Sequence, residues 1–239
     1  MKKLLISMTF LCAVVPLLAQ DHKQQPAVPK PDPAPKMIEF QMALLKRGPK
    51  PLPRNWQVSP LRRQHIAYVG SLLNSGKAVI GGPVRDDAEL RGVIIFRSKS
   101  ADEARGWIMS DPAVLAEHFA VELHPWWSQD VMKRTTTPDQ LMVAYLAFLV
   151  RGDKWTPEKT PETEAIQKAH LDNINRLAEM KKLVVAGPFG DDGTLRGIFV
   201  FRVNSIEEAR ELAATDPAVK AGRLALQIHP WLVPEGILP

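Results

Sequence analysis

The sequence predicts an α+β fold in which one βαββαβ module occurs twice, and three observations lead to it. Residues 65–126 align with residues 170–231 without a gap, and 26 of the 62 aligned pairs are identical. A self-match at one fixed offset indicates one structural unit used twice. Segments with the two-residue period of a strand alternate with segments of helical spacing, in the same order in both copies. That order is the ferredoxin-like arrangement.

Each element of the first copy follows from its residue pattern. Apolar and polar residues alternate over 38–44, whereas Leu61 and His65 begin a stripe of helical spacing. Ser100, with Glu103 three residues later, forms the pattern of a capping box and predicts the start of a second helix. The expected elements are therefore a strand at 38–44, a helix at 61–75, strands at 78–80 and 92–97, a helix from Ser100 and a strand at 119–126.

The second copy repeats this order and favours a closed arrangement of the two. On its last strand Leu226 and Ile228 share a face for the helices, while His229 and Trp231 share the opposite face. Because each sheet leaves one face bare, we expect the two sheets to pack together as an intramolecular dimeric α+β barrel. The expected elements are a strand at 142–149, a helix at 161–180, strands at 183–186 and 197–202, a helix opened by the capping box Ser205 to Glu208, and a strand at 224–231.

The two modules follow segments of different composition. Residues 1–19 begin with a methionine and two lysines, continue as an apolar run too short to span a bilayer and end on a small residue. This pattern predicts a signal peptide, with an uncleaved N-terminal anchor as the alternative. Residues 20–36 are rich in proline and predict an extended linker. Module one is then expected at 37–128 and module two at 141–234.

Export and composition limit the partners and the chemistry. A cleaved signal peptide predicts a periplasmic or secreted protein with no membrane attachment afterwards. The single cysteine, Cys12, lies inside that peptide, so the mature chain is expected to have neither a disulfide nor a cysteine nucleophile. No run of Lys and Arg interleaves with aromatic residues, so nucleic acid is not an expected partner. We expect no cofactor, a small-molecule ligand, and either a monomer with a pseudo-dimeric barrel or a higher homo-oligomer.

His65 and His170 hold the same position of the first helix in the two copies and are the candidate catalytic residues. Histidine both accepts and donates a proton near neutral pH. The alternative is a buried histidine that bonds to the backbone. Asp111 and Asp216 each precede a proline near the end of the second helix. Each carboxylate would orient the imidazole of its own copy, or it is a turn residue.

The tripeptide His-Pro-Trp ends both copies and supplies candidate ligand-binding residues. His124 and Trp126, like His229 and Trp231, lie two residues apart and share one face of a strand. They would line a ligand pocket there. In the alternative interpretation the proline terminates the strand and the tryptophan covers the end of the barrel.

The acidic pairs at 86–87 and 191–192 are interpreted as hairpin turns. Metal binding would need further ligands at a regular spacing, and no such His or Asp pattern accompanies them. No metal site is therefore expected.

These motifs, taken in register, resemble the YCII-related domain. The resemblance rests on the helix-borne His, a strand ending in Gly-Pro, an Asp-Asp-Gly turn, a Ser-x-x-Glu-Ala-Arg helix start and an Asp-Pro-x-x-x-Ala-Gly tail, and it covers both modules. Module one departs from it at Ala88 and Glu117, where module two has Gly193 and Gly222. The resemblance implies a ferredoxin-like dimeric barrel and an enzymatic role resting on a paired His and Asp. A few relatives act on chlorinated or hydroxylated aromatic rings by elimination.

Two classes of function stay open at this point. One is a cofactor-independent lyase or isomerase that acts on a small cyclic or aromatic molecule through a His-Asp pair. The other is a non-catalytic periplasmic module that binds a small molecule or another protein. Because glycine accepts a positive φ that alanine does not, and because Glu117 adds a long side chain, we expect any single working site to lie in module two.

Overall fold

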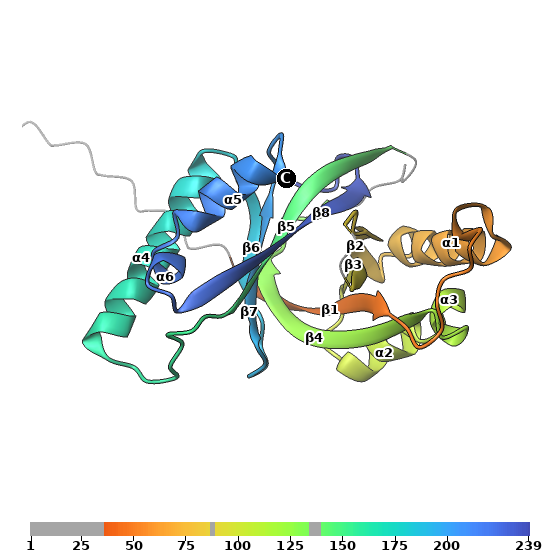
Figure 1. Ribbon diagram of the computed structural model, residues 1–239, viewed down its shortest axis with the longest axis horizontal. Helices are drawn as coiled ribbons and strands as arrows, with labels where there is room; N and C mark the ends of the chain where they lie inside the picture. The colour runs from red at the N-terminus through yellow and green to blue at the C-terminus, as the bar shows by residue number, and fades with distance from the viewer. Residues whose placement is uncertain (1–35, 87–88, 134–139) are drawn as a thin grey trace, which may run out of the picture. The chain divides into compact units, whose positions relative to one another are not determined.

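Each copy folds as a four-stranded antiparallel sheet with its helices on one face (Figure 1). The structure is a computed structural model that describes residues 36–86, 89–133 and 140–239. The elements of module one are β1 (Met37–Arg47), η1 (Trp56–Val58), α1 (Pro60–Asn74), β2 (Ala78–Pro83), β3 (Leu90–Phe96), α2 (Ala101–Ile108), α3 (Pro112–Leu115) and β4 (Phe119–Gln129). Those of module two are β5 (Leu141–Arg151), α4 (Pro161–Glu179), β6 (Leu183–Pro188), β7 (Leu195–Phe201), α5 (Ile206–Ala214), α6 (Pro217–Lys220) and β8 (Leu224–Pro234).

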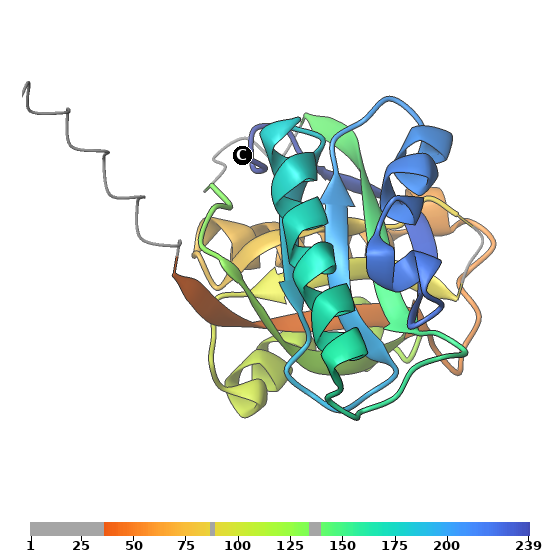
Figure 2. The ribbon, with the colours of Figure 1, turned by 90° about the vertical axis from the view of Figure 1, so that its left-hand side faces the viewer.

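The strand orders of the two sheets are identical and confirm the expected fold. They are β2-β3-β1-β4 and β6-β7-β5-β8, with every neighbouring pair antiparallel. This is the order that a βαββαβ module produces. The helices pack on the outer faces, as Figure 2 shows for α4, α5 and α6 over the second sheet.

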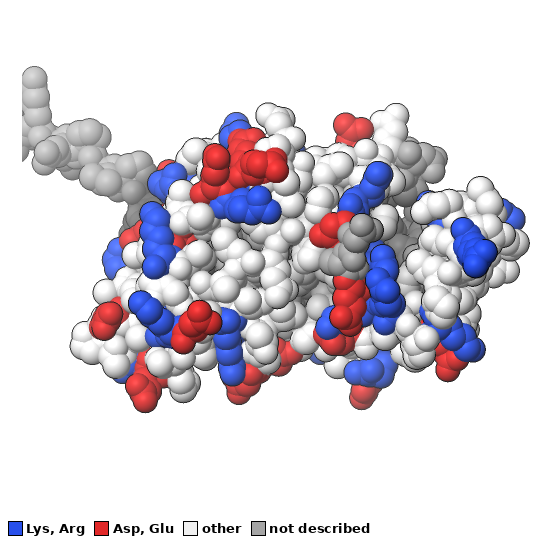
Figure 3. All heavy atoms as spheres, viewed as in Figure 1, with Lys and Arg blue, Asp and Glu red and all other residues white. Residues whose placement is uncertain are grey.

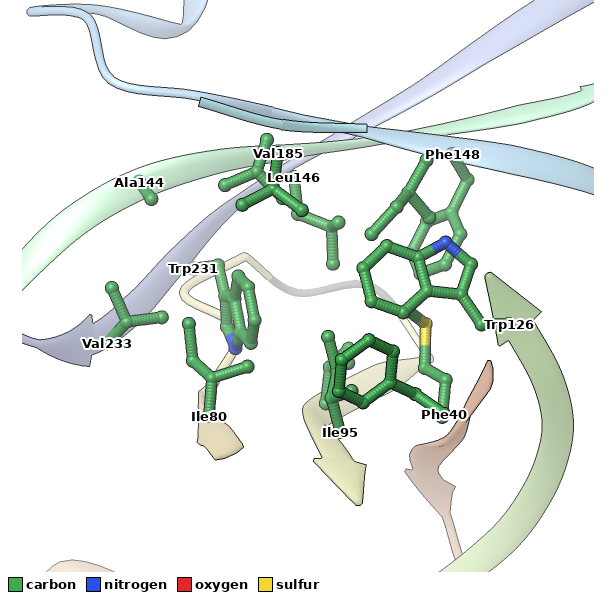
Figure 4. Close-up of a cluster of buried hydrophobic side chains, with 14 of the residues drawn as sticks. Phe40, Ile80, Ile95, Trp126, Ala144, Leu146, Phe148, Val185, Trp231 and Val233 are labelled. Carbon is green, nitrogen blue, oxygen red and sulfur yellow. The ribbon is translucent and has the colours of Figure 1, made fainter. Parts of the chain in front are cut away.

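The bare faces of the two sheets meet in one apolar core that both modules share. Phe40 and Trp126 of module one face Phe148 and Trp231 of module two, and each of these side chains is at most 2% exposed (Figure 4). Two further apolar clusters lie between each sheet and its own helices. Residues 35–239 therefore form one compact unit around a common core.

Two pseudo-symmetric seams close the barrel. Val84, just after β2, pairs with Trp231 of β8, and Trp126 of β4 pairs with Phe189, just after β6. At each seam the backbones approach so closely that only glycine fits: a Cβ atom on Gly187 would lie 1.8 Å from the Trp127 carbonyl oxygen, a distance no atom tolerates. The Gly-Pro motif therefore belongs to the closure of the barrel.

The proline of the His-Pro-Trp motif does not terminate its strand, and that interpretation is wrong. β4 continues from Pro125 to Gln129, and β8 runs to Pro234. In an antiparallel strand the amide and carbonyl of one residue point to the same side. The Pro125 carbonyl accepts from the Gly190 amide of module two, so the missing proline N–H faces the seam and removes no bond from the β1 ladder.

The two expected capping boxes form only in half. Ser100 accepts from the Glu103 amide and Ser205 from the Glu208 amide, as the motif requires. The glutamate side chains do not return the bond to the cap. Glu103 accepts from the Ser98 hydroxyl, and Glu208 accepts from the Lys182 ammonium and the Asn204 amide.

Several expectations concern residues outside the described ranges. The expected signal peptide at 1–19, the linker up to residue 35, and Asp87 and Ala88 all belong there. Among the described helices, none is both long enough and apolar enough to cross a membrane. On the face seen in Figure 3, basic and acidic side chains are interspersed, so the basic residues do not gather into a single patch on that face.

Candidate functional site

The structure pairs His170 with Asp216, as the sequence led us to expect. His170 lies on α4, and its Nδ1 is 2.7 Å from Oδ2 of Asp216 at the start of α6. The Asp216 side chain is fully buried, and the His170 side chain is 12% exposed. The imidazole also stacks on Phe199 of β7, with the ring centroids 5.9 Å apart and the planes 20° from parallel. Among the described residues, none hydrogen-bonds to the second nitrogen of His170, Nε2.

Asp216 fulfils both of the interpretations that its sequence context allowed. Its Oδ1 accepts from the Ala218 amide at 2.8 Å and caps α6, while Oδ2 holds the imidazole. A carboxylate at Nδ1 fixes the orientation of the ring and stabilises its protonated form. The helix cap in turn holds the carboxylate, so both groups are fixed before any ligand arrives.

Module one contains the same pair in different surroundings. His65 Nδ1 lies 2.7 Å from Asp111 Oδ2, and Asp111 Oδ1 accepts from the Ala113 amide at 2.8 Å. Two aromatic rings pack on this imidazole, with centroids at 6.4 Å for Trp56 and 5.3 Å for Phe119. These rings also contact each other edge to face. The side chains around His65 thus form an aromatic cluster.

Module two instead has a cavity of about 740 Å³ beside His170. It lies between α4, the 152–160 loop and the second sheet. Leu224 stands where module one has Phe119, and Thr160 stands where it has Trp56. The cavity is lined by apolar side chains of α4 and the sheet and by Trp155, Arg151, Arg196 and Arg223. Sequence patterns did not single out these last four residues, because they come from a loop and from three different strand ends.

The left-handed backbone position before the last strand is present in both modules. Gly222 has φ of 72° and Glu117 has φ of 63°, so module one accepts there a conformation that costs a non-glycine residue about 1–2 kcal/mol. The second expected difference was that Gly193, which replaces Ala88, provides a positive φ in module two. That reasoning is wrong, because Gly193 is not among the described glycines with positive φ.

Two further His-Asp pairs join the modules to each other. His124 Nδ1 lies 2.7 Å from Asp191 Oδ2, and His229 Nδ1 lies 2.6 Å from Asp86 Oδ2. The interpretation of Asp86 and Asp191 as turn residues alone was therefore incomplete. Their presence in both copies was a signal, but the sequence does not say that each binds the histidine of the other copy.

The tryptophans of the same motif complete each seam. Trp126 Nε1 donates to the Gly187 carbonyl at 3.1 Å, and Trp231 Nε1 donates to the Gly82 carbonyl at 3.0 Å. Both indoles are fully buried, so a ligand at these rings would have to displace part of the core. Ligand binding by His124, Trp126, His229 and Trp231 stays a prediction.

No group of three or more His, Cys, Asp or Glu side chains in the described part of the chain converges as metal ligands would. The four candidate catalytic residues lie in two His-Asp pairs, one in each module. Their catalytic role stays a prediction.

Comparison with known proteins agrees with this architecture. The family model for the YCII-related domain matches residues 40–126 and again residues 147–232. The uncharacterised protein YjpA of Bacillus subtilis (strain 168) is 32% identical over 90 residues, which are 38% of this chain and 95% of YjpA.

Solved structures of similar fold span both modules at once. A chlorite dismutase variant from Candidatus Nitrospira defluvii aligns with a TM-score of 0.53 and 12% identity, over 82% of this chain and 91% of that one. A heme-binding protein from Thermus thermophilus aligns with a TM-score of 0.50 and 14% identity, over 83% and 93% of the two chains. At such low identity the likeness shows the fold alone.

Proposed function

The chain belongs to the YCII-related domain family and contains its domain twice, and from this we propose that module two is the working copy, a lyase or isomerase in which His170 transfers a proton. One observation carries the proposal. The Nε2 atom of His170 has no hydrogen-bond partner among the described residues, and its side chain lines a cavity of about 740 Å³. The matching imidazole of module one packs against Trp56 and Phe119.

The chemistry follows from the two ring nitrogens of His170. With Nδ1 held by Asp216, Nε2 is the atom that takes a proton from a carbon or hydroxyl group of the substrate. The imidazolium that forms is stabilised by the buried carboxylate. In an isomerisation the same proton returns at another position of the substrate. In an elimination the electron pair of the broken C–H bond forms a double bond and expels the leaving group as an anion.

Asp216 acts in this scheme as a positioning residue. Replacing it by Asn keeps one oxygen for the cap on Ala218 but removes the charge that favours imidazolium. The expected result is a stable protein whose rate falls at least about 100-fold, the typical contribution of one positioned acid–base group.

Proton exchange tests the proposal without knowledge of the natural substrate. Hydroxylated and chlorinated benzenes are incubated with the protein in D₂O, and NMR follows deuterium incorporation and release of chloride. We expect activity in the native chain and in His65→Ala, and loss of at least about 100-fold in His170→Ala. Equal losses in the two variants would indicate two equivalent sites, and loss in His65→Ala alone would reverse the assignment. No exchange on any ring would contradict the proposed reaction class.

A second candidate function is binding without catalysis. It is favoured by module one, where the same His-Asp pair persists with its imidazole packed among aromatic rings. There the pair links α1 to α3, a structural task that it would also perform in module two. An imidazole with a carboxylate on Nδ1 and a free Nε2 is in addition a donor that heme iron accepts. Hemin therefore belongs among the binding probes, with the Soret band of His170→Ala against His65→Ala as the readout.

A further inference from the structure

The cavity of module two gathers positive charge around one aromatic ring. The guanidinium carbons of Arg151, Arg196 and Arg223 lie 5.5, 4.7 and 5.3 Å from the centroid of the Trp155 ring. All four side chains line the cavity that contains His170. Arg196 and Arg223 are half-buried, whereas Arg151 is exposed.

None of these guanidinium groups forms an ion pair with a carboxylate within the described ranges. Their hydrogen bonds go to neutral acceptors: Arg151 donates to the Asp192 carbonyl, Arg196 to the Asp191 carbonyl, and Arg223 to the hydroxyl and carbonyl of Thr156. The acidic residues that line the cavity, Glu158, Glu164 and Asp192, are all exposed.

The three guanidinium groups around the Trp155 ring repel each other. Cations held close together repel each other, and the repulsion grows as they leave bulk water. The Trp155 ring offsets part of it through cation–π attraction, worth about 0.5–1 kcal/mol for each exposed pair. An anion bound between the arginines would offset the rest.

Module one keeps only part of this arrangement. Arg47 and Arg91 stand at the positions of Arg151 and Arg196, but Pro51 and His118 replace Trp155 and Arg223. Module one also has an additional negative charge, because Glu117 stands where module two has Gly222. Glu117 forms an ion pair with Lys50 at 2.6 Å. The third arginine and the tryptophan that the arginines surround are therefore found in module two and not at the matching positions of module one.

We propose that this cavity binds a small organic carboxylate, with its carboxylate held by Arg196 and Arg223 beside Trp155 and its hydrocarbon part beside Phe199, Leu224 and His170. The planar guanidinium group pairs with a carboxylate through two parallel hydrogen bonds, and apolar walls with a few polar groups are typical of small-molecule sites. The proposal rests on the proposed function for the identity of the reacting group and adds the class of its substrate.

Three matched probes test the charge requirement. Benzoate, its neutral analogue benzamide and phenyl phosphate are titrated against the full chain at up to about 10 mM, which detects a Kd in the millimolar range, by calorimetry and by NMR shifts of the Trp155 indole. We expect benzoate to bind, benzamide to bind at least about tenfold more weakly, and added salt to weaken benzoate binding. Binding of phenyl phosphate alone would refute the carboxylate, and failure of all three probes, or equal binding of benzoate and benzamide, would refute the anion site.

Variants locate the site and separate this proposal from catalysis. Arg196→Gln and Arg223→Gln are each expected to weaken benzoate binding at least about tenfold, with Arg223→Lys intermediate. Arg91→Gln, the matched change in module one, should leave it unchanged, and equal effects at Arg91 and Arg196 would contradict the assignment. If benzoate binds but no variant of His170 alters proton exchange, the proposed reaction is wrong and the anion site stands. If His170→Ala lowers proton exchange but benzoate does not bind, the anion site alone is refuted.

Discussion

Replacing Trp231 by Phe tests whether the seams make two modules into one folding unit. The change deletes the indole N–H that donates to the Gly82 carbonyl across the seam at 3.0 Å, and a buried acceptor left without its donor costs about 1–3 kcal/mol. The indole is fully buried, so the smaller ring leaves a gap. A gap of about 40 Å³ adds about 1 kcal/mol.

Together these terms predict that the free energy of unfolding falls by about 2–4 kcal/mol. For a cooperative unit of this size, each kcal/mol lowers Tm by about 2–4 °C, so a shift of roughly 5–15 °C is expected. Urea denaturation followed by circular dichroism gives the free energy, and calorimetry gives Tm and the number of transitions.

Two matched variants control the experiment. Trp126→Phe breaks the equivalent bond to the Gly187 carbonyl at the other seam and should cost about the same. Trp127→Phe alters a neighbouring indole that is 39% exposed and should cost less than about 0.5 kcal/mol. A loss below about 0.5 kcal/mol for Trp231→Phe, or two separate transitions in the native chain, would refute the shared folding unit.

Two further predictions follow from single contacts, and a third follows from the N-terminal sequence. His65→Ala and His170→Ala should each lower the free energy of unfolding by about 1–3 kcal/mol in urea denaturation, because each removes the imidazole partner of a fully buried carboxylate, Asp111 or Asp216. Arg97 donates two 2.7 Å hydrogen bonds to Asp130, which lowers the pKa of that carboxyl, so Arg97→Gln should raise this pKa in an NMR titration; the pair stabilises the fold above the ordinary aspartate pKa, and the gain disappears as the pH falls through the lowered value. We also propose that the protein is exported, so N-terminal sequencing from the native host should begin near Gln20, and an intact Met1 in the cytosol would contradict this.

The sequence was informative wherever a contact is local or lies within one module. Periodicity and the internal repeat were enough for the βαββαβ order, and the resemblance to the YCII-related domain implied the pairing of His170 with Asp216. The contacts across the seams were not accessible in this way. Asp86 and His229 are 143 residues apart, and a turn motif does not identify a partner on another module.

The cavity was missed for a different physical reason. Trp155 lies in an irregular loop, and the arginines around it come from the ends of β5 and β7 and the approach to β8. No periodic pattern links such positions, because each belongs to a different element. Only the fold brings them onto one ring.

The seams also change what the internal repeat means. Across the pseudo-twofold axis, each seam joins the His-Pro-Trp segment of one module to the Gly-Pro and Asp residues of the other module. Because there are two seams, each copy has to carry both sets of residues, and a loss in either copy weakens one seam. Part of the identity between the copies, at Gly82, Asp86, His124 and Trp126 and their twins, thus serves closure of the barrel. The residues that distinguish a working site should accordingly be those at which the copies differ, as Arg223 differs from its counterpart in module one.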